Sequence, residues 1–211
     1  MQLFFDDDGK VYVSAAQWTT ISPTKDRFST FAVEIDITTG RSLTRPVLLR
    51  QSDLINDCAE GPHIIKRGDW YYLITAEGGT ELNHRAMIFR SKHPLGPYEE
   101  PPAGVNPLVH NSPDDPHVRQ TGHADLVQAE NGDWWGVLLA TRRQVGNTEQ
   151  LGRETFLVPV EWPEDGWPVF NRSQAVGLTV LSNSLPNLTT KLDWRDDFTK
   201  RKPSASHWSR S

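Results

Sequence analysis

The sequence predicts an all-β protein of the β-propeller type. Its aromatic residues lie mostly in short apolar or alternating runs bounded by Gly, Pro, Asn or Asp, which is typical of strands. A Gly turn followed by an aromatic strand occurs three times, at Gly9, Gly68 and Gly132, with spacings of 59 and 64 positions. We find no amphipathic helix of three turns. A repeat of about 60 residues with several antiparallel strands indicates propeller blades.

Each repeat supplies its own set of predicted strands. In the first, Leu3-Phe4-Phe5 precedes the turn, and the later strands are 10–14, 31–37 and 46–49. In the second, an apolar strand leads into the Gly68 hairpin, and strands 70–74 and 86–91 follow before an ending at Gly96-Pro97-Tyr98. The third contains 134–139, 154–160 and 167–170. Gly suits the turns because it adopts positive φ at no steric cost.

These strands supply about three blades, whereas a closed propeller usually has at least four. We therefore expect a partial β-propeller domain over 1–170, a polar linker over 171–192 and, over 193–211, the incomplete start of a C-terminal β-sandwich domain. Leu3-Phe4-Phe5 is predicted to be an inner strand, although only two residues precede it. The alternative for the repeats is an ordinary β-sandwich with three similar hairpins.

Composition excludes several classes of function. The chain has 211 residues with 22 Lys+Arg against 27 Asp+Glu, a net charge of −5, so a broad nucleic-acid or membrane surface is not expected. No apolar run approaches the roughly 18 residues of a membrane-spanning helix. Cys58 is the single cysteine, which excludes an internal disulfide. No signal peptide is visible, and we expect part of the N-terminus to be missing, so the sequence predicts neither compartment nor oligomeric state.

The strongest local signal is Ala59-Glu60-Gly61-Pro62-His63-Ile64. Gly and Pro fix the backbone directly after a carboxylate, and an apolar strand follows. A Glu held on a stiff strand near a propeller axis suits a general acid, because a desolvating pocket raises the pKa of a carboxyl group. Taken alone, the pattern is also that of a solvated surface glutamate.

Further motifs give Glu60 a context. They occur in the order Thr75-Ala76-Glu77-Gly78-Gly79-Thr80, Asn83-His84, Thr121-Gly122-His123-Ala124-Asp125-Leu126-Val127, Leu151-Gly152-Arg153-Glu154-Thr155 and Asp165-Gly166-Trp167-Pro168-Val169. Together with Glu60-Gly61-Pro62-His63, this ordered set closely resembles glycoside hydrolase family 43, in particular its β-xylosidase and α-L-arabinofuranosidase branch. The resemblance covers about residues 3 to 170. Asp193 to Phe198 resembles the start of the β-sandwich that follows in that branch, so we expect a chain truncated at both ends.

The resemblance implies a five-bladed β-propeller that hydrolyses xylo-oligosaccharides or arabinose-decorated chains from the non-reducing end with inversion. Glu60 matches the general acid. The positions of the family's base Asp and of the Asp that tunes the acid fall upstream of Met1, so we expect this chain by itself to be inactive or nearly so. Asp6, Asp7 and Asp8 precede the Gly9 turn, and we expect them to form an exposed hairpin tip without a catalytic role.

Three more residues are predicted to bind substrate. Arg153 matches an Arg that reaches the substrate, with a surface ion pair to Glu154 as the alternative. His123 matches an axial His, and the alternative is a buried, hydrogen-bonded side chain. Trp18 is a candidate platform for a sugar ring, although a strand Trp is often a core residue. We expect supporting roles for His63, Glu77 and His84.

No metal-ligand spacing is present, so we predict no required cofactor, with calcium an optional ion as in some family members. The expected partner is a xylo-oligosaccharide or arabinoxylan-derived substrate. Two alternatives stay open at this stage. The chain could be a non-catalytic carbohydrate-binding propeller, or a truncated gene product that does not function and has no stable fold because the open ring exposes unpaired blade faces.

Overall fold

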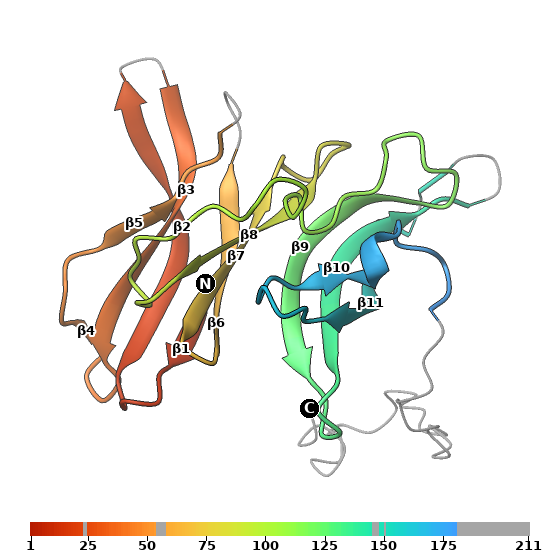
Figure 1. Ribbon diagram of the computed structural model, residues 1–211. Helices are drawn as coiled ribbons and strands as arrows, with labels where there is room; N and C mark the ends of the chain where they lie inside the picture. The colour runs from red at the N-terminus through yellow and green to blue at the C-terminus, as the bar shows by residue number, and fades with distance from the viewer. Residues whose placement is uncertain (23–24, 54–57, 145–147, 150, 181–211) are drawn as a thin grey trace, which may run out of the picture. The chain divides into compact units, whose positions relative to one another are not determined.

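The computed structural model describes residues 1–22, 25–53, 58–144, 148–149 and 151–180. The predicted β-sandwich start, 193–211, lies outside the described residues, as does most of the predicted linker. Three antiparallel sheets follow one another along the chain, all within the compact unit Met1–Leu181 (Figure 1). The expectation of an all-β fold is therefore confirmed for the described residues.

The first sheet consists of five strands in the order β1-β2-β3-β4, with β5 also paired to β3. Their bounds are Gln2–Phe5 for β1, Val11–Ser22 for β2, Lys25–Asp36 for β3, Arg41–Ser42 for β4 and Val47–Arg50 for β5. The turn between β1 and β2 places Gly9 at φ +84, as the sequence predicts. The sequence located the start of the β2–β3 hairpin but not its length of 12 residues in each strand.

The second sheet has three strands in the order β6-β7-β8, with bounds Ala59–Arg67, Trp70–Glu77 and Arg85–Ser91. Gly68, between β6 and β7, has φ +58. The third sheet has the order β12-β11-β10-β9, and Gly132 turns the chain between β9 and β10 with φ +91. Its strands are Val118–Gln128 for β9, Trp134–Arg142 for β10, Arg153–Glu161 for β11 and Val169–Phe170 for β12, and the 3-10 turn η1 follows at Asn171–Ser173.

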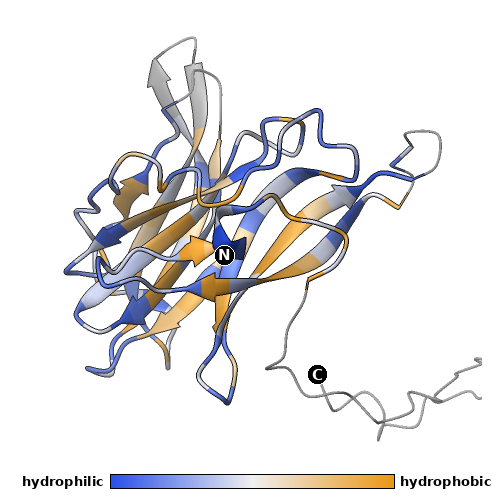
Figure 2. Cartoon of the chain, turned by 45° about the vertical axis from the view of Figure 1, so that its right-hand side comes forward, coloured by the Kyte–Doolittle hydropathy of each residue, from blue (hydrophilic) through white to orange (hydrophobic). Residues whose placement is uncertain are grey.

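Two apolar layers join neighbouring sheets, and Figure 2 shows the hydrophobic residues concentrated in the strands. The layer between the first and second sheets contains Ala32, Ile64, Tyr71, Leu73 and Phe89. The larger layer between the second and third sheets includes Tyr72, Ile74, Ile88, Leu126, Leu138, Val158 and Trp167. Because the middle sheet is covered on both faces, its central strand β7 is almost continuously buried.

One expectation for the first turn is wrong. Asp6 is buried, with 9% of its surface exposed, rather than part of an exposed tip. Its carboxylate accepts hydrogen bonds from Lys66 Nζ and from the Tyr71 hydroxyl, each at 2.7 Å. Asp7 and Asp8 are exposed as expected. Asp6 therefore fastens the first sheet to the second, at the end of β6 opposite Glu60.

The first residues of the predicted linker pack on the sheets. Val176 is buried in the larger apolar layer, and its backbone N–H and C=O both bond to the side chain of Asn111 at 2.9 Å. No helix among the described residues is long and apolar enough to cross a membrane.

Candidate active site

Glu60 stands at a break in the pairing of β6 with β7. Glu60 is paired with Ala76, but the next partners are His63 and Ile74, so the register shifts between them. Paired residues of antiparallel strands point to the same face. Glu60 and His63 therefore share the face of Ile74, which belongs to the apolar layer toward the third sheet. Gly61 makes the bulge possible with φ +53.

Two histidine rings lie directly against glycine backbone at this place. A Cβ added to Gly61 would come within 2.5 Å of His123 Nε2, and a Cβ added to Gly122 within 2.7 Å of His84 Nε2. His123 itself adopts φ +49, a conformation that few residues other than Gly take. The glycines of both sequence motifs thus serve the close approach of the second and third sheets.

Polar contacts reinforce this approach. His84 Nδ1 lies 2.8 Å from the carbonyl oxygen of Gln120. His63 Nδ1 lies 3.0 Å from Asp125 Oδ2. Each of the two histidines therefore links the second sheet to the third through a side-chain contact.

The electrostatics place Glu60 and Arg153 near both histidines, of which His84 is buried and His123 is half-buried. Burial is the main cause that lowers the pKa of His84 and of His123, because it disfavours the charged imidazolium. The Glu60 carboxylate opposes that lowering in both rings, whereas the Arg153 guanidinium adds to it. The structure thus brings Glu60 and Arg153 each within electrostatic reach of His84 and His123.

Arg153 is the first residue of β11 and is exposed. Its predicted alternative partner, Glu154, instead forms an ion pair with Arg142. Among the described residues, no ion pair involves Arg153, so its donors are available at the surface beside the histidines.

Trp18 comes from the first sheet. It is 70% exposed and packs on Phe28 with ring centroids 5.2 Å apart, so the alternative of a core residue is wrong. Ser14, four residues earlier on β2, donates a hydrogen bond to the carbonyl oxygen of Pro62 on β6. Because strand side chains alternate, Trp18 lies on the same face of β2 as Ser14, the face turned toward the strand of Glu60.

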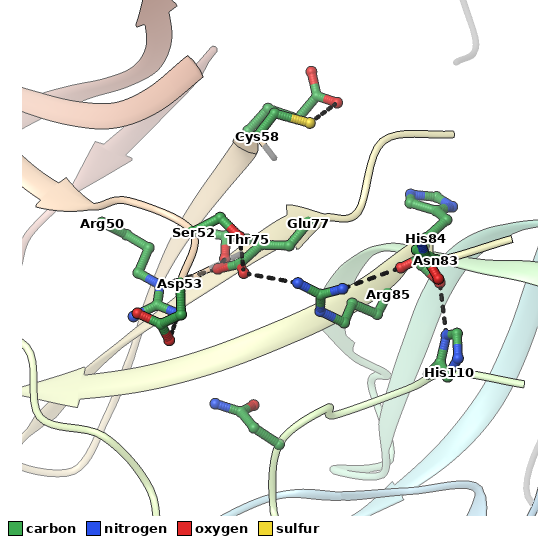
Figure 3. A network of polar contacts seen from close by, with 12 residues as sticks. Arg50, Ser52, Asp53, Cys58, Thr75, Glu77, Asn83, His84, Arg85 and His110 are labelled. Carbon is green, nitrogen blue, oxygen red and sulfur yellow. Dashed lines mark hydrogen bonds and ion pairs between the residues drawn. The ribbon is translucent and has the colours of Figure 1, made fainter. Parts of the chain in front are cut away.

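The predicted supporting residue Glu77 anchors a buried ion network (Figure 3). Its side chain is 1% exposed, and it accepts bonds from Arg50 Nε at 2.9 Å, Ser52 Oγ at 2.9 Å and Arg85 Nη2 at 3.3 Å. Arg50 also binds Asp53 and Glu100. Since Glu77 is paired with Ala59, this network fixes the end of β6 immediately before Glu60.

Sequence reasoning missed three residues around Glu60. Cys58 Sγ lies 3.7 Å from Glu60 Oε1, Ser14 holds Pro62, and Asp125 holds His63. Of these three residues, only Asp125 could have been noticed from the sequence, because it lies inside one of the ordered motifs. Within the described part of the chain, no group of three or more His, Cys, Asp or Glu could hold a metal ion. A cavity of about 300 Å³ lies apart from Glu60, lined by residues of the segments 104–111 and 165–175.

Comparison with known proteins extends these observations. The family model for glycosyl hydrolases family 43 matches residues 1–168. A non-reducing end α-L-arabinofuranosidase from Bacteroides ovatus is 45% identical over 75% of this chain and 32% of its own length. A xylan 1,3-β-xylosidase from Vibrio sp is 34% identical over 98% of this chain and 42% of its own length.

Among solved structures, a xylan β-1,4-xylosidase from Bacillus halodurans C-125 has a TM-score of 0.82 and 31% identity, over 95% of this chain and 38% of that one. These likenesses confirm the β-propeller fold type, of which the three described sheets are blades. The chain spans about a third to two fifths of the length of these relatives.

Proposed function

The chain belongs to glycosyl hydrolases family 43, and on this premise we propose that it acts as a glycoside hydrolase on xylan-derived or arabinose-decorated chains, with Glu60 as the general acid. The relatives named as an arabinofuranosidase and as xylosidases support this substrate class. The observation that carries the proposal is the position of Glu60, on a bulge between two sheets and within electrostatic reach of His123, a ring that Arg153 also influences.

In this proposal the Glu60 carboxyl protonates the glycosidic oxygen as the bond to the anomeric carbon breaks. A second carboxylate activates water on the opposite face of the sugar, and inversion requires a separation of roughly 6.5–9.5 Å between the two. Arg153 donates hydrogen bonds to sugar hydroxyls, because a guanidinium presents several donors in a fixed fork. Trp18 offers its exposed ring as an apolar platform for a sugar.

His123 acts as a neutral hydrogen-bonding group in this scheme. The lowered pKa of His123 supports that role, since the ring stays uncharged at neutral pH. We propose no required cofactor. Calcium prefers six to eight oxygen ligands, whereas the described neighbours of His123 include two other imidazoles, so they do not form a calcium site and no step is assigned to that ion.

The base is proposed to come from outside the described residues. Of the described carboxylates near Glu60, Glu77 is buried among two arginines and a serine, and Asp125 is held by His63. Neither is free to activate water. As a separate proposal, the 211-residue chain alone binds sugar without efficient turnover, which keeps the second candidate function, a non-catalytic carbohydrate-binding propeller, under test.

The test is hydrolysis of nitrophenyl β-xyloside and nitrophenyl α-L-arabinofuranoside by this chain and by a version extended upstream in its own reading frame. The proposal expects turnover only in the extended form, and a loss of about 10²–10⁴-fold in Glu60→Gln, the range typical of general acid catalysis. Calorimetric binding of xylobiose without turnover in either form would favour the binding propeller. Robust turnover by this chain that is unchanged in Glu60→Gln would contradict the assigned acid.

A further inference from the structure

The bulge that carries Glu60 is held from both neighbouring sheets. From the first sheet, the buried Ser14 hydroxyl donates to the carbonyl oxygen of Pro62 at 3.2 Å. From the third sheet, the His123 ring fills the space where a side chain on Gly61 would lie. The bulge therefore has little freedom to shift as a unit.

The link between Glu60 and His63 is also stiff. Only Gly61 and Pro62 separate the two residues. Gly61 is fixed at φ +53 with no room for a Cβ, and the ring of Pro62 restricts its own φ. A change in the placement of the His63 side chain is thus transmitted along a short, rigid segment to Glu60.

Asp125 is the carboxylate that contacts His63. Its Oδ2 lies 3.0 Å from His63 Nδ1, and its Oδ1 accepts the backbone N–H of Leu126 at 2.8 Å. One oxygen therefore anchors the carboxylate on β9, and the other lies at ion-pair distance from the imidazole. Burial is the largest influence and opposes the charged form of Asp125, but the contact and charge of His63, the Leu126 backbone N–H and the His123 ring together outweigh it and hold the pKa of that carboxyl below its usual value.

We propose that Asp125 is a positioning residue for the Glu60 carboxyl, acting through His63 and the Gly61-Pro62 bulge. The inference rests on the proposed function for the identity of the acid, but its structural part does not depend on turnover. Asp125 places the acid against the leaving oxygen and takes no proton from the sugar. The third sheet thereby controls the geometry of a residue that belongs to the second.

The structural part is tested by NMR of the 211-residue chain. Asp125→Asn should shift the backbone amide signal of Gly61 and the side-chain carboxyl signal of Glu60. Asp69→Asn is the matched control, because Asp69 is an exposed residue of the Gly68 turn at the other end of the same strand pair. Unshifted Gly61 and Glu60 signals in folded Asp125→Asn would overturn the proposal. Should that variant fail to fold, His63→Gln is measured in the same way.

The catalytic part is tested by leaving-group dependence in the form that turns over. A misplaced acid slows substrates whose leaving group needs protonation and spares activated ones. Asp125→Asn should therefore lower kcat on xylobiose by about tenfold and on dinitrophenyl β-xyloside by about twofold or less, part of the range that a general acid contributes. Glu60→Gln should show the same selectivity with a larger loss, and Asp125→Glu should recover part of the rate.

The outcomes separate the two proposals. An equal loss on both substrates would mean a merely structural Asp125 and would overturn the positioning role. If Asp125→Asn shifts the Gly61 and Glu60 signals but no form of the protein hydrolyses any glycoside, the link from Asp125 to Glu60 is supported and the proposed function is contradicted.

Discussion

The middle sheet joins its two neighbours by different chemistry at the end that carries Glu60. Toward the first sheet, the buried Glu77 carboxylate binds Arg50 and Arg85 in a charged network. Toward the third sheet, the neutral rings of His84 and His123 lie against glycine backbone. The stability of the charged junction depends on every partner of Glu77. The stability of the histidine junction depends on glycines that carry no side chain and on uncharged imidazole rings.

Breaking the charged junction should have the largest effect on stability. Glu77→Gln leaves two buried guanidinium groups without their shared carboxylate, and removing one partner of a buried ion pair typically costs about 3–5 kcal/mol. We expect a loss of this size in the free energy of unfolding, measured by urea denaturation with circular dichroism. Glu154→Gln, which removes only the more exposed pair with Arg142, should change it little. Similar small losses in both variants would contradict the central role given to Glu77.

The histidine junction should be the next most sensitive, through its glycines. Gly61→Ala combines a clash with His123 and a positive φ, so we expect a loss of about 2–4 kcal/mol from overpacking and strain together. Gly68→Ala is the control, because Gly68 has φ +58 but nothing within 4 Å of an added Cβ. Its cost should be that of the strain alone, about 1–2 kcal/mol. Equal midpoints of urea unfolding for the two variants would rule out the close ring contact.

The two junctions should also differ in how their contributions to stability depend on pH. His84 and His123 have lowered pKa values in the folded chain, so the unfolded chain binds more protons below about pH 6.5 and the histidine junction loses stability as the pH falls through that value. The carboxylates Asp6 and Asp125, also with lowered pKa values, lose their contribution only as the pH falls below their usual value of 3.8. Urea midpoints from pH 7.5 to 5 should decline, and His84→Gln should flatten that decline. A flat profile in the unmodified chain would exclude the histidine effect.

Arg153 should have the smallest effect on folding, because it lies outside both junctions. Arg153→Met should leave the urea midpoint nearly unchanged, since this exposed residue has no ion pair among the described residues. It should instead raise the pKa values of His84 and His123, because the guanidinium lowers both. Titration of the two imidazoles by NMR checks this. Unchanged histidine titrations would place Arg153 too far from the rings to share a site with them.

Much of the fold could be predicted from local sequence, because Gly turns and aromatic strands repeat. The turns at Gly9, Gly68 and Gly132 all have the positive φ that their composition predicts. Glu60, His123 and Arg153 could be picked out because their motifs occur in a fixed order. The proposed roles of these residues stay predictions.

The contacts between sheets could not be predicted in the same way. Asp6 looked like one of three turn carboxylates, because its partners Lys66 and Tyr71 lie about sixty positions away in the chain. Asp125 and Ser14 are likewise meaningful only once β9 and β2 are seen beside β6. Residue type and spacing report local conformation well, but they do not show which distant side chain satisfies a buried group.

Because the Glu60 bulge is held by contacts from two sheets, its geometry is completed in steps as the chain is synthesised. Ser14 is synthesised before Glu60, whereas His123 and Asp125 are synthesised more than sixty residues after it. During vectorial synthesis the first two sheets can therefore dock while the Glu60 side chain is still incompletely fixed. The geometry of Glu60 is completed only when β9 emerges from the ribosome and packs, so a nascent chain stalled before that strand carries the carboxylate without its final placement.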